Sequence, residues 1–182
     1  MINIDRGKLL AEINDLAVFA GKEILNIYHH GVKVRKKSDN SPVTEADEAA
    51  EKIILAGLRR LTPNIPVVAE EEISKGNLID VGDKPFWLVD PLDGTKEFIA
   101  NRNEYTVNIG LIENTKPTMG VVFAPALGQC FSADGTGTAV KRFESSEPQQ
   151  INARELPNSD IFVSTSRSHS DPMEMSKLLK DY

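Results

Sequence analysis

Hydrophobic residues in the first part of the chain repeat with the period of a helix. Between positions 5 and 30, apolar side chains recur three or four residues apart, and Gly31 follows as a natural stop. A second stretch with the same period begins near Thr44 and ends at Thr62. The pattern predicts two amphipathic helices, separated by a basic and polar loop or hairpin over residues 32–40.

Beyond the second helix the pattern changes to one that predicts strands. Two short apolar runs, 65–69 and 86–89, lead directly to the carboxylates of Glu70 and Asp90. Apolar and polar residues then alternate over 105–111, as is typical of a half-buried strand. A turn and further short runs follow, so we expect antiparallel hairpins. These runs cover 118–123, 129–132 and 138–143.

The C-terminal part has a different character. Residues 144–158 are polar and contain two prolines, which is typical of a linker. A strand is then predicted over 161–164 and a helix from Asp171 onward. We therefore expect an α+β fold, with two N-terminal helices packed on an antiparallel sheet over 1–150, followed by a linker and the start of a second α/β unit over 151–182.

Composition and charge narrow the classes of function. The 182 residues carry 21 Lys and Arg against 27 Asp and Glu, a net charge of −6, with no long basic run. This balance argues against a nucleic-acid polymer as partner. Cys130 is the single cysteine, so no intrachain disulfide can form and a reducing compartment is compatible with the sequence. We expect Cys130 to be a small buried residue.

No targeting or membrane segment is evident in the sequence. The N-terminus lacks the apolar stretch of a signal peptide, and no later run is long enough to span a membrane. We expect a cytoplasmic protein. A peripheral membrane association and a homo-oligomer both stay open.

The strongest chemical signal is the segment Asp-Pro-Leu-Asp-Gly-Thr. It sets Asp90 and Asp93 at a strand end, where carboxylates suit a hard cation such as Mg²⁺ that shares its ligands with phosphate. The amides of Gly94 and Thr95 follow where a turn could open into a helix, a place that favours phosphate. Read alone, Asp-Pro is also the start of a type I turn. Together with Glu70, the segment predicts a metal-dependent phosphatase site.

This segment also resembles the signature of the lithium-sensitive, Mg²⁺-dependent phosphatases related to inositol monophosphatase. Its continuation, Lys96-Glu97-Phe98, is most similar to the 3′(2′),5′-bisphosphate nucleotidases, which remove the 3′-phosphate from 3′-phosphoadenosine 5′-phosphate. The resemblance implies a layered, sugar-phosphatase-like fold. Other segments of the family recur in order along nearly the whole chain: Lys37-Ser38-Asp39, Ser41 to Asp47, Val68 to Glu72, and Ser166-Arg167-Ser168-His169.

The resemblance implies a role for each candidate residue. It implies two or more Mg²⁺ ions bound by the metal ligands Glu70, Asp90, the Leu92 carbonyl and Asp93. It implies that Thr95 relays a proton from water toward Asp47. The resemblance also implies substrate contacts, some of them by the same residues, and it implies that Ser166 and His169 face the nucleotide. The residues implied to contact substrate are Glu70, Leu92, Asp93, Gly94, Thr95, Ser166 and His169.

The residues by themselves allow plainer interpretations. Thr44 and Asp47 form the Thr-x-x-Asp pattern of a helix capping box. Lys37 is typical of a solvated loop lysine, and Glu71 of a solvated loop acid. His169 is typical of a surface residue ahead of a helix. These alternatives stay open at the level of sequence.

Family members continue beyond the length of this chain. Their C-terminal half carries a Trp-Asp motif whose Asp completes the second metal site, and nothing after Asp171 resembles it. We therefore expect the chain to be the N-terminal portion of such a phosphatase, and its activity alone stays open. The preferred function is a bisphosphate nucleotidase that yields AMP and phosphate and clears a by-product of sulfate activation. The alternatives are an inositol or sugar monophosphatase with the same metal core, and a metal-binding fragment without turnover.

Overall fold

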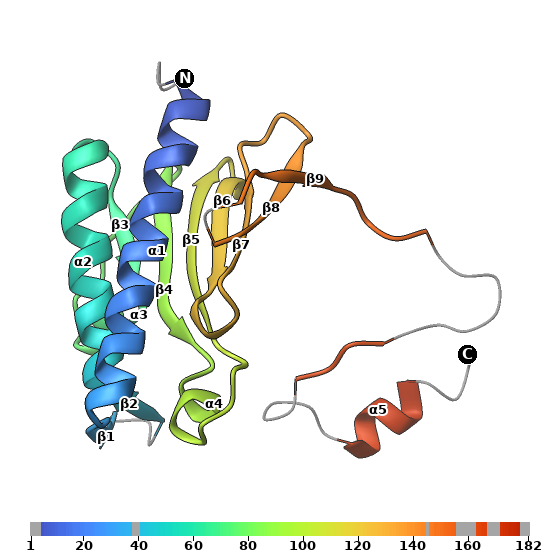
Figure 1. Cartoon of the computed structure of the whole chain (residues 1–182). Coiled ribbons are helices and arrows are strands. Elements are labelled where there is room, and N and C mark those ends of the chain that lie inside the picture. The colour runs from blue at the N-terminus through green and yellow to red at the C-terminus, as the bar shows by residue number, and fades with distance from the viewer. Residues whose placement is uncertain (1–4, 38–40, 145, 156–162, 167–171, 179–182) are drawn as a thin grey trace. The chain divides into compact units, whose positions relative to one another are not determined.

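The computed structural model describes residues 5–37, 41–144, 146–155, 163–166 and 172–178 (Figure 1). Contacts divide the chain into two compact units, Met1–Ile151 and Asn152–Tyr182. In the second unit the described residues include one helix, α5 (Pro172–Leu178). That this unit begins a further α/β domain stays a prediction.

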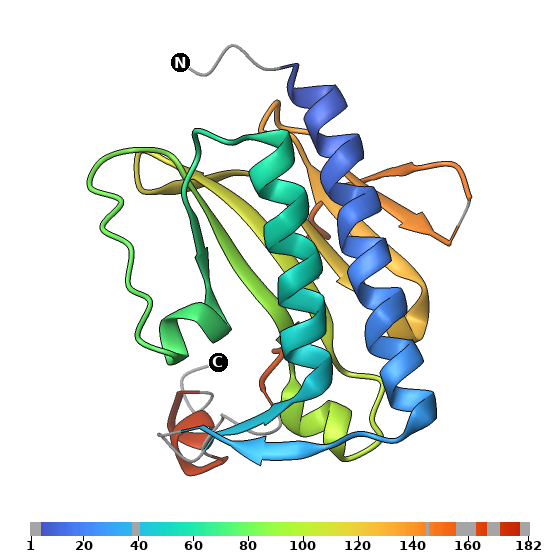
Figure 2. The ribbon, with the colours of Figure 1, turned by 90° about the vertical axis from the view of Figure 1, so that its left-hand side faces the viewer.

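Two long helices, α1 (Arg6–His30) and α2 (Glu45–Leu61), form one layer of the first unit. They lie side by side across the sheet in Figure 2. At the start of α1 the Asp5 carboxylate accepts a hydrogen bond from the Lys8 amide, and Gly31 follows the last turn with a φ of 97°. Both helices agree with the periodicity of the sequence.

The second layer is a seven-stranded sheet with strands in the order of the chain. The β3–β4 pair is parallel and all other pairs are antiparallel. The predicted α+β fold, with helices packed on a largely antiparallel sheet, is confirmed. The strands are β3 (Val67–Ala69), β4 (Phe86–Asp93), β5 (Thr106–Glu113), β6 (Lys116–Ala124), β7 (Gln129–Ala133), β8 (Ala139–Phe143) and β9 (Gln149–Ile151).

Smaller elements connect these layers. The predicted loop or hairpin after α1 is a hairpin of two short strands, β1 (Val34–Lys36) and β2 (Pro42–Thr44). Two five-residue helices, α3 (Glu70–Ser74) and α4 (Thr95–Ile99), follow β3 and β4, and a 3₁₀ turn, η1 (Pro125–Leu127), follows β6.

The structure corrects two details at the C-terminal end. Residues 149–151, predicted as linker, form β9 and pair with β8, so that Ala139 faces Ile151. This strand was missed because it is short and Gln-rich. Val163 and Ser164 have no strand assignment, although a strand was predicted over 161–164, while Ile161 and Phe162 lie outside the described residues.

The core lies between the helices and one face of the sheet. Its largest fully buried side chain is Trp87, whose indole N–H donates to Thr62 Oγ1 at 2.8 Å. Cys130 is 4% exposed and belongs to the same core, as the sequence predicted. Among the described residues, no helix combines the length and the apolarity that crossing a bilayer requires.

Gly21, in the middle of α1, should resist replacement by Ala. An added Cβ would lie 2.7 Å from Phe123 Cδ1 and 2.9 Å from Pro125 Cγ. Overpacking a core lowers the free energy of unfolding by about 1–3 kcal/mol. Because these contacts are so short, we expect a loss near the upper end of that range. That cost exceeds the ~1 kcal/mol that Ala gains over Gly in a helix. We expect Gly21→Ala to lower the urea midpoint.

Gly7, in the first turn of α1, is the matched control for Gly21. A Cβ there would meet only Asp5 Oδ1, at an ordinary 3.5 Å. Gly7→Ala should therefore leave stability unchanged or raise it by up to ~1 kcal/mol. A Gly21→Ala variant as stable as Gly7→Ala would contradict the close packing of α1 on β6.

Candidate active site

Glu70 and Asp90 each follow the last residue pair of the parallel strands β3 and β4. Ala69 ends β3 and is paired with Val89 of β4, so the carboxylate of Glu70, the first residue of α3, and that of Asp90, which continues β4, both come directly after this pair. The side chains of Glu70 and Asp90 are hydrogen-bonded to each other. The sequence placed Glu70 and Asp90 directly after two apolar runs, and this register agrees with that placement.

Asp90 is held in an environment that disfavours its charged form. Burial is the main cause, followed by the charges of Glu70 and Asp93 and the hydrogen bond with Glu70, and together they raise the pKa of Asp90 to about 8. The Leu92 amide donates to Asp90 Oδ1 at 3.2 Å and opposes this shift. Such a group of acids attracts positive charge.

The segment from Asp90 to Asp93 is strand, so the alternative of a type I turn is wrong here. β4 continues to Asp93, with a shift in its register against β5 between Asp90 and Asp93. Gly94 then starts α4 with a φ of 95°, and a Cβ on it would lie 2.6 Å from Glu104 O. Only glycine fits this close approach, which brings the Thr95 side chain back toward α2.

Asp47 connects the start of α2 to Thr95. Its Oδ2 accepts from the Thr44 amide at 2.7 Å, and the Asp47 amide donates to the Thr44 side chain, so the predicted capping box is present. The Thr44 hydroxyl also donates to Asp47 Oδ2, at 2.6 Å. Its Oδ1 lies 3.0 Å from Thr95 Oγ1, a hydroxyl that is also 3.1 Å from the Leu92 carbonyl oxygen. The capping contacts and the contact with Thr95 therefore coexist, one on each carboxylate oxygen, while the role of the pair in proton transfer stays a prediction.

This arrangement leaves the Thr95 oxygen able to accept a hydrogen bond. Asp47 is 1% exposed, and burial raises its pKa although the hydrogen bonds from Thr44 and Thr95 oppose the shift. Because both neighbours of the Thr95 hydroxyl are acceptors, its proton points to one of them and its lone pairs face away. A water molecule beside Thr95 could donate into those lone pairs.

Lys37 and Glu71 are not the solvated loop residues that their sequence context suggested. Lys37 Nζ lies 2.7 Å from Glu70 Oε1 and 2.7 Å from Glu71 Oε1, and Glu71 is 2% exposed. Burial alone would lower the pKa of Lys37, but hydrogen bonds and charges of the two acids outweigh it and raise that pKa. In the sequence, Lys37 and Glu71 both lie in segments that resemble the family, and Glu71 stands beside a predicted ligand.

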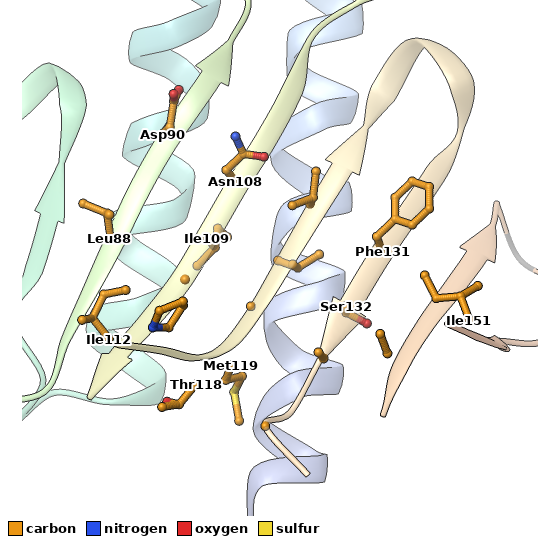
Figure 3. A pocket seen from close by; sticks show the side chains of 18 residues that line it. Leu88, Asp90, Asn108, Ile109, Ile112, Thr118, Met119, Phe131, Ser132 and Ile151 are labelled. Atoms are coloured by element: carbon orange, nitrogen blue, oxygen red, sulfur yellow. The ribbon is translucent and has the colours of Figure 1, made fainter. Parts of the chain in front are cut away.

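Asn108 is a second neighbour that the sequence did not single out. It is the partner of Asp90 in the β4–β5 register, and its Nδ2 donates to Asp93 Oδ2 at 3.2 Å. Figure 3 shows Asp90 and Asn108 together on the sheet face opposite the long helices, at one end of an apolar groove. The groove has a volume of about 620 Å³, and its lining includes Leu88, Ile112, Val122, Phe131 and Ile151.

The oxygen atoms at this strand edge fit a divalent cation by their chemistry. Glu70, Asp90, Asp93 and the Leu92 carbonyl would supply hard ligands. The pKa of Asp90 is raised first by burial and then by the negative charges of Glu70 and Asp93, and a cation would neutralise those charges. Within the described ranges, no three His, Cys, Asp or Glu side chains lie grouped so that they could hold a metal ion. In this arrangement Lys37 contacts Glu70, and Asn108 contacts Asp93.

The two remaining candidates lie elsewhere in the chain. Ser166 is an exposed residue of the second unit, whose placement relative to the first is not defined. His169 lies outside the described residues. A nucleotide contact by either one stays a prediction.

Comparison with known proteins identifies relatives over most of the chain. Residues 5–182 match the model of the "Inositol monophosphatase family". The 3′(2′),5′-bisphosphate nucleotidase CysQ of Escherichia coli strain K12 is 45% identical over 166 residues, 90% of this chain and 65% of that protein. The nucleotidase of the same name from Salmonella typhimurium strain LT2 is 44% identical over 165 residues, again 90% and 65%. The chain thus spans just under two thirds of the length of these curated relatives.

Solved structures give the same picture of the fold. The crystal structure of CysQ from Bacteroides thetaiotaomicron, described as a bacterial member of the inositol monophosphatase family, is 32% identical with a TM-score of 0.65. The match covers 98% of this chain and 70% of that one. The IMPase of Thermotoga maritima is 27% identical with a TM-score of 0.67, over 84% of this chain and 55% of that one.

Proposed function

The chain belongs to the inositol monophosphatase family, and from that premise we propose that it forms the metal-binding part of a 3′(2′),5′-bisphosphate nucleotidase. The reaction proposed is hydrolysis of the 3′-phosphate of 3′-phosphoadenosine 5′-phosphate to AMP and phosphate. The choice of nucleotide over inositol ester is supported by the 45% identity to a nucleotidase named CysQ.

The observation that carries the chemistry is the proximity of Glu70 and Asp90 at one edge of the sheet. Thr95, which is hydrogen-bonded to Asp47, follows Asp90 closely in the sequence. Phosphatases of this family are generally metal-dependent, and we propose Mg²⁺ held by Glu70, Asp90, Asp93 and the Leu92 carbonyl. Bound Mg²⁺ would offset the charge of the phosphate oxygens and make a nearby water more acidic.

The protein's own groups then have defined tasks. We propose that, as the attacking water gives a proton to Thr95 Oγ1, the Thr95 hydroxyl passes its own proton to Asp47 Oδ1, so that the Asp47 carboxylate ends up carrying the proton. The amides of Gly94 and Thr95 are proposed to hold a phosphate oxygen. The water oxygen forms the new bond to phosphorus as the bond to the ribose 3′-oxygen breaks, and that oxygen leaves on AMP and takes up a proton from solvent water, giving AMP and inorganic phosphate.

A pH-dependent stability measurement tests the acidic cluster directly. The folded-state pKa of Asp90 is about 8, against a usual value of 3.8. As pH rises from about 4 to about 8, the unfolded chain releases this proton before the folded one does, so the Asp90 contribution to stability is lost on raising the pH. Without divalent cation we expect the urea midpoint of the wild type to fall over this range more than that of Asp90→Asn.

Adding Mg²⁺ should reverse this loss at pH 8 and have little effect at pH 5, because the cation binds the ionised carboxylates of the folded state. Glu48→Gln is the control, since Glu48 pairs with Arg35 and Lys75 outside the cluster. A wild type whose midpoint is insensitive to Mg²⁺ at pH 8 would contradict the proposed cation site.

A further inference from the structure

Glu51 is a buried acid to which the proposed reaction gives no task. It lies on α2 one turn after Asp47 and is only 2% exposed. A glutamate is almost never this buried unless its carboxylate is paired. Its partner therefore indicates what the side chain does.

That partner is the backbone of α3. Glu51 Oε2 accepts a hydrogen bond from the Glu71 amide at 2.8 Å, in a contact that is buried. The first amides of a helix have no acceptor within the helix, and Ala69, at the N-cap of α3, has no side chain that could serve. Glu51 thus supplies from α2 the cap that α3 lacks.

This hydrogen bond acts next to a proposed cation ligand. The Glu71 amide belongs to the planar peptide group whose carbonyl is that of Glu70, so fixing the amide orients the backbone at the Glu70 Cα. The Glu71 side chain is fixed as well, because its Oε1 lies 2.7 Å from Lys37 Nζ. The same ammonium group contacts Glu70 Oε1 at 2.7 Å.

We propose that Glu51 is a positioning residue that holds Glu70 in the direction needed to bind a divalent cation beside Asp90. The inference rests on the proposed function, because the direction of Glu70 matters only if the cluster binds a cation. Glu51 itself touches neither cation nor substrate in this role. What it provides is an acceptor for one backbone amide.

The test compares two replacements of nearly equal size. Glu51→Gln keeps an oxygen that can accept from the Glu71 amide, whereas Glu51→Met fills the same space without an acceptor. Mg²⁺ binding to the purified protein is measured by calorimetry at pH 8. Loss of a partner that orients a metal ligand typically weakens metal binding about 10- to 100-fold. We expect that weakening in Glu51→Met and a Kd close to that of the wild type in Glu51→Gln.

Leu58→Ala separates positioning from general stability. Leu58 is fully buried on the same helix, two turns beyond Glu51, and its truncation destabilises the core without touching α3's cap. The melting temperature of the Leu58→Ala variant should fall, while the Kd of this variant for Mg²⁺ stays near the wild-type value. Should Glu51→Met be unfolded, Glu51→Ala takes its place in the comparison.

Three results would overturn the inference. Wild-type affinity in Glu51→Met would show that the acceptor is not needed, and equal weakening in Glu51→Gln would assign the effect to the lost charge. Equal weakening in Leu58→Ala would assign it to stability. A wild type that binds no Mg²⁺ would be a different failure, since it removes the proposed function and this inference together.

Discussion

Changing Asp90 to Asn is expected to reduce Mg²⁺-dependent phosphate release by more than about 100-fold. Loss of a residue that only hydrogen-bonds to a metal ligand typically costs roughly 10- to 100-fold, and loss of a ligand itself should cost more. Asn has nearly the same size as Asp, so the packing of β4 is retained while one ligand charge is removed. The ionised form of Asp90 is also disfavoured by burial and by the charges of Glu70 and Asp93, which together raise its pKa to about 8. The measurement is kcat/KM as a function of Mg²⁺ concentration.

Asp134→Asn is the matched control for this substitution. Asp134 also accepts side-chain and backbone hydrogen bonds, but its partner is Thr136 in a surface turn away from the cluster. We expect turnover close to that of the wild type in this control. Near-normal turnover in Asp90→Asn would remove Asp90 from the set of metal ligands.

Replacing Thr95 by Val should lower kcat by about 10²–10⁴, the range usual for loss of a group that takes part in proton transfer. Val has the shape of Thr and lacks only the hydroxyl that lies 3.0 Å from Asp47 Oδ1. The Asp47 capping contacts with Thr44 stay in place, so α2 should keep its stability. The measurement is kcat and KM at saturating Mg²⁺.

Thr95→Ser restores the hydroxyl and serves as the control for Thr95→Val. We expect it to recover most of the lost kcat. A loss that appeared only in KM would assign Thr95 to substrate binding, and equal kcat in the Val and Ser variants would exclude the hydroxyl from proton transfer.

The helices and most strands could be predicted because their apolar positions follow one clear period. The end of β4 could not, because Asp-Pro-Leu-Asp-Gly has the local preferences of a turn. In the structure Asp90 instead pairs with Asn108, and Asp93 pairs with Thr106 after a shift in register. Pairing with β5 therefore outweighs the local tendency to turn.

The proposed ligands could be found from sequence because Glu70 and Asp90 each end an apolar run. The residues that support them were harder to see. Lys37 and Glu71 meet only after the β1–β2 hairpin and α3 are folded, and nothing in their own segments encodes that contact. Glu51 had a usable signal, since it falls on the buried stripe of α2 with Asp47, Ile54 and Leu58, where an acid needs a partner.

The measurement that tests the central claim is phosphate release by the purified protein with and without Mg²⁺. 3′-Phosphoadenosine 5′-phosphate and inositol 1-phosphate are offered side by side, and Asp90→Asn gives the background. The account predicts Mg²⁺-dependent release from the nucleotide, far above both the inositol ester and the Asp90→Asn background. Release mainly from inositol 1-phosphate, or release that persists without Mg²⁺ or in Asp90→Asn, would contradict it.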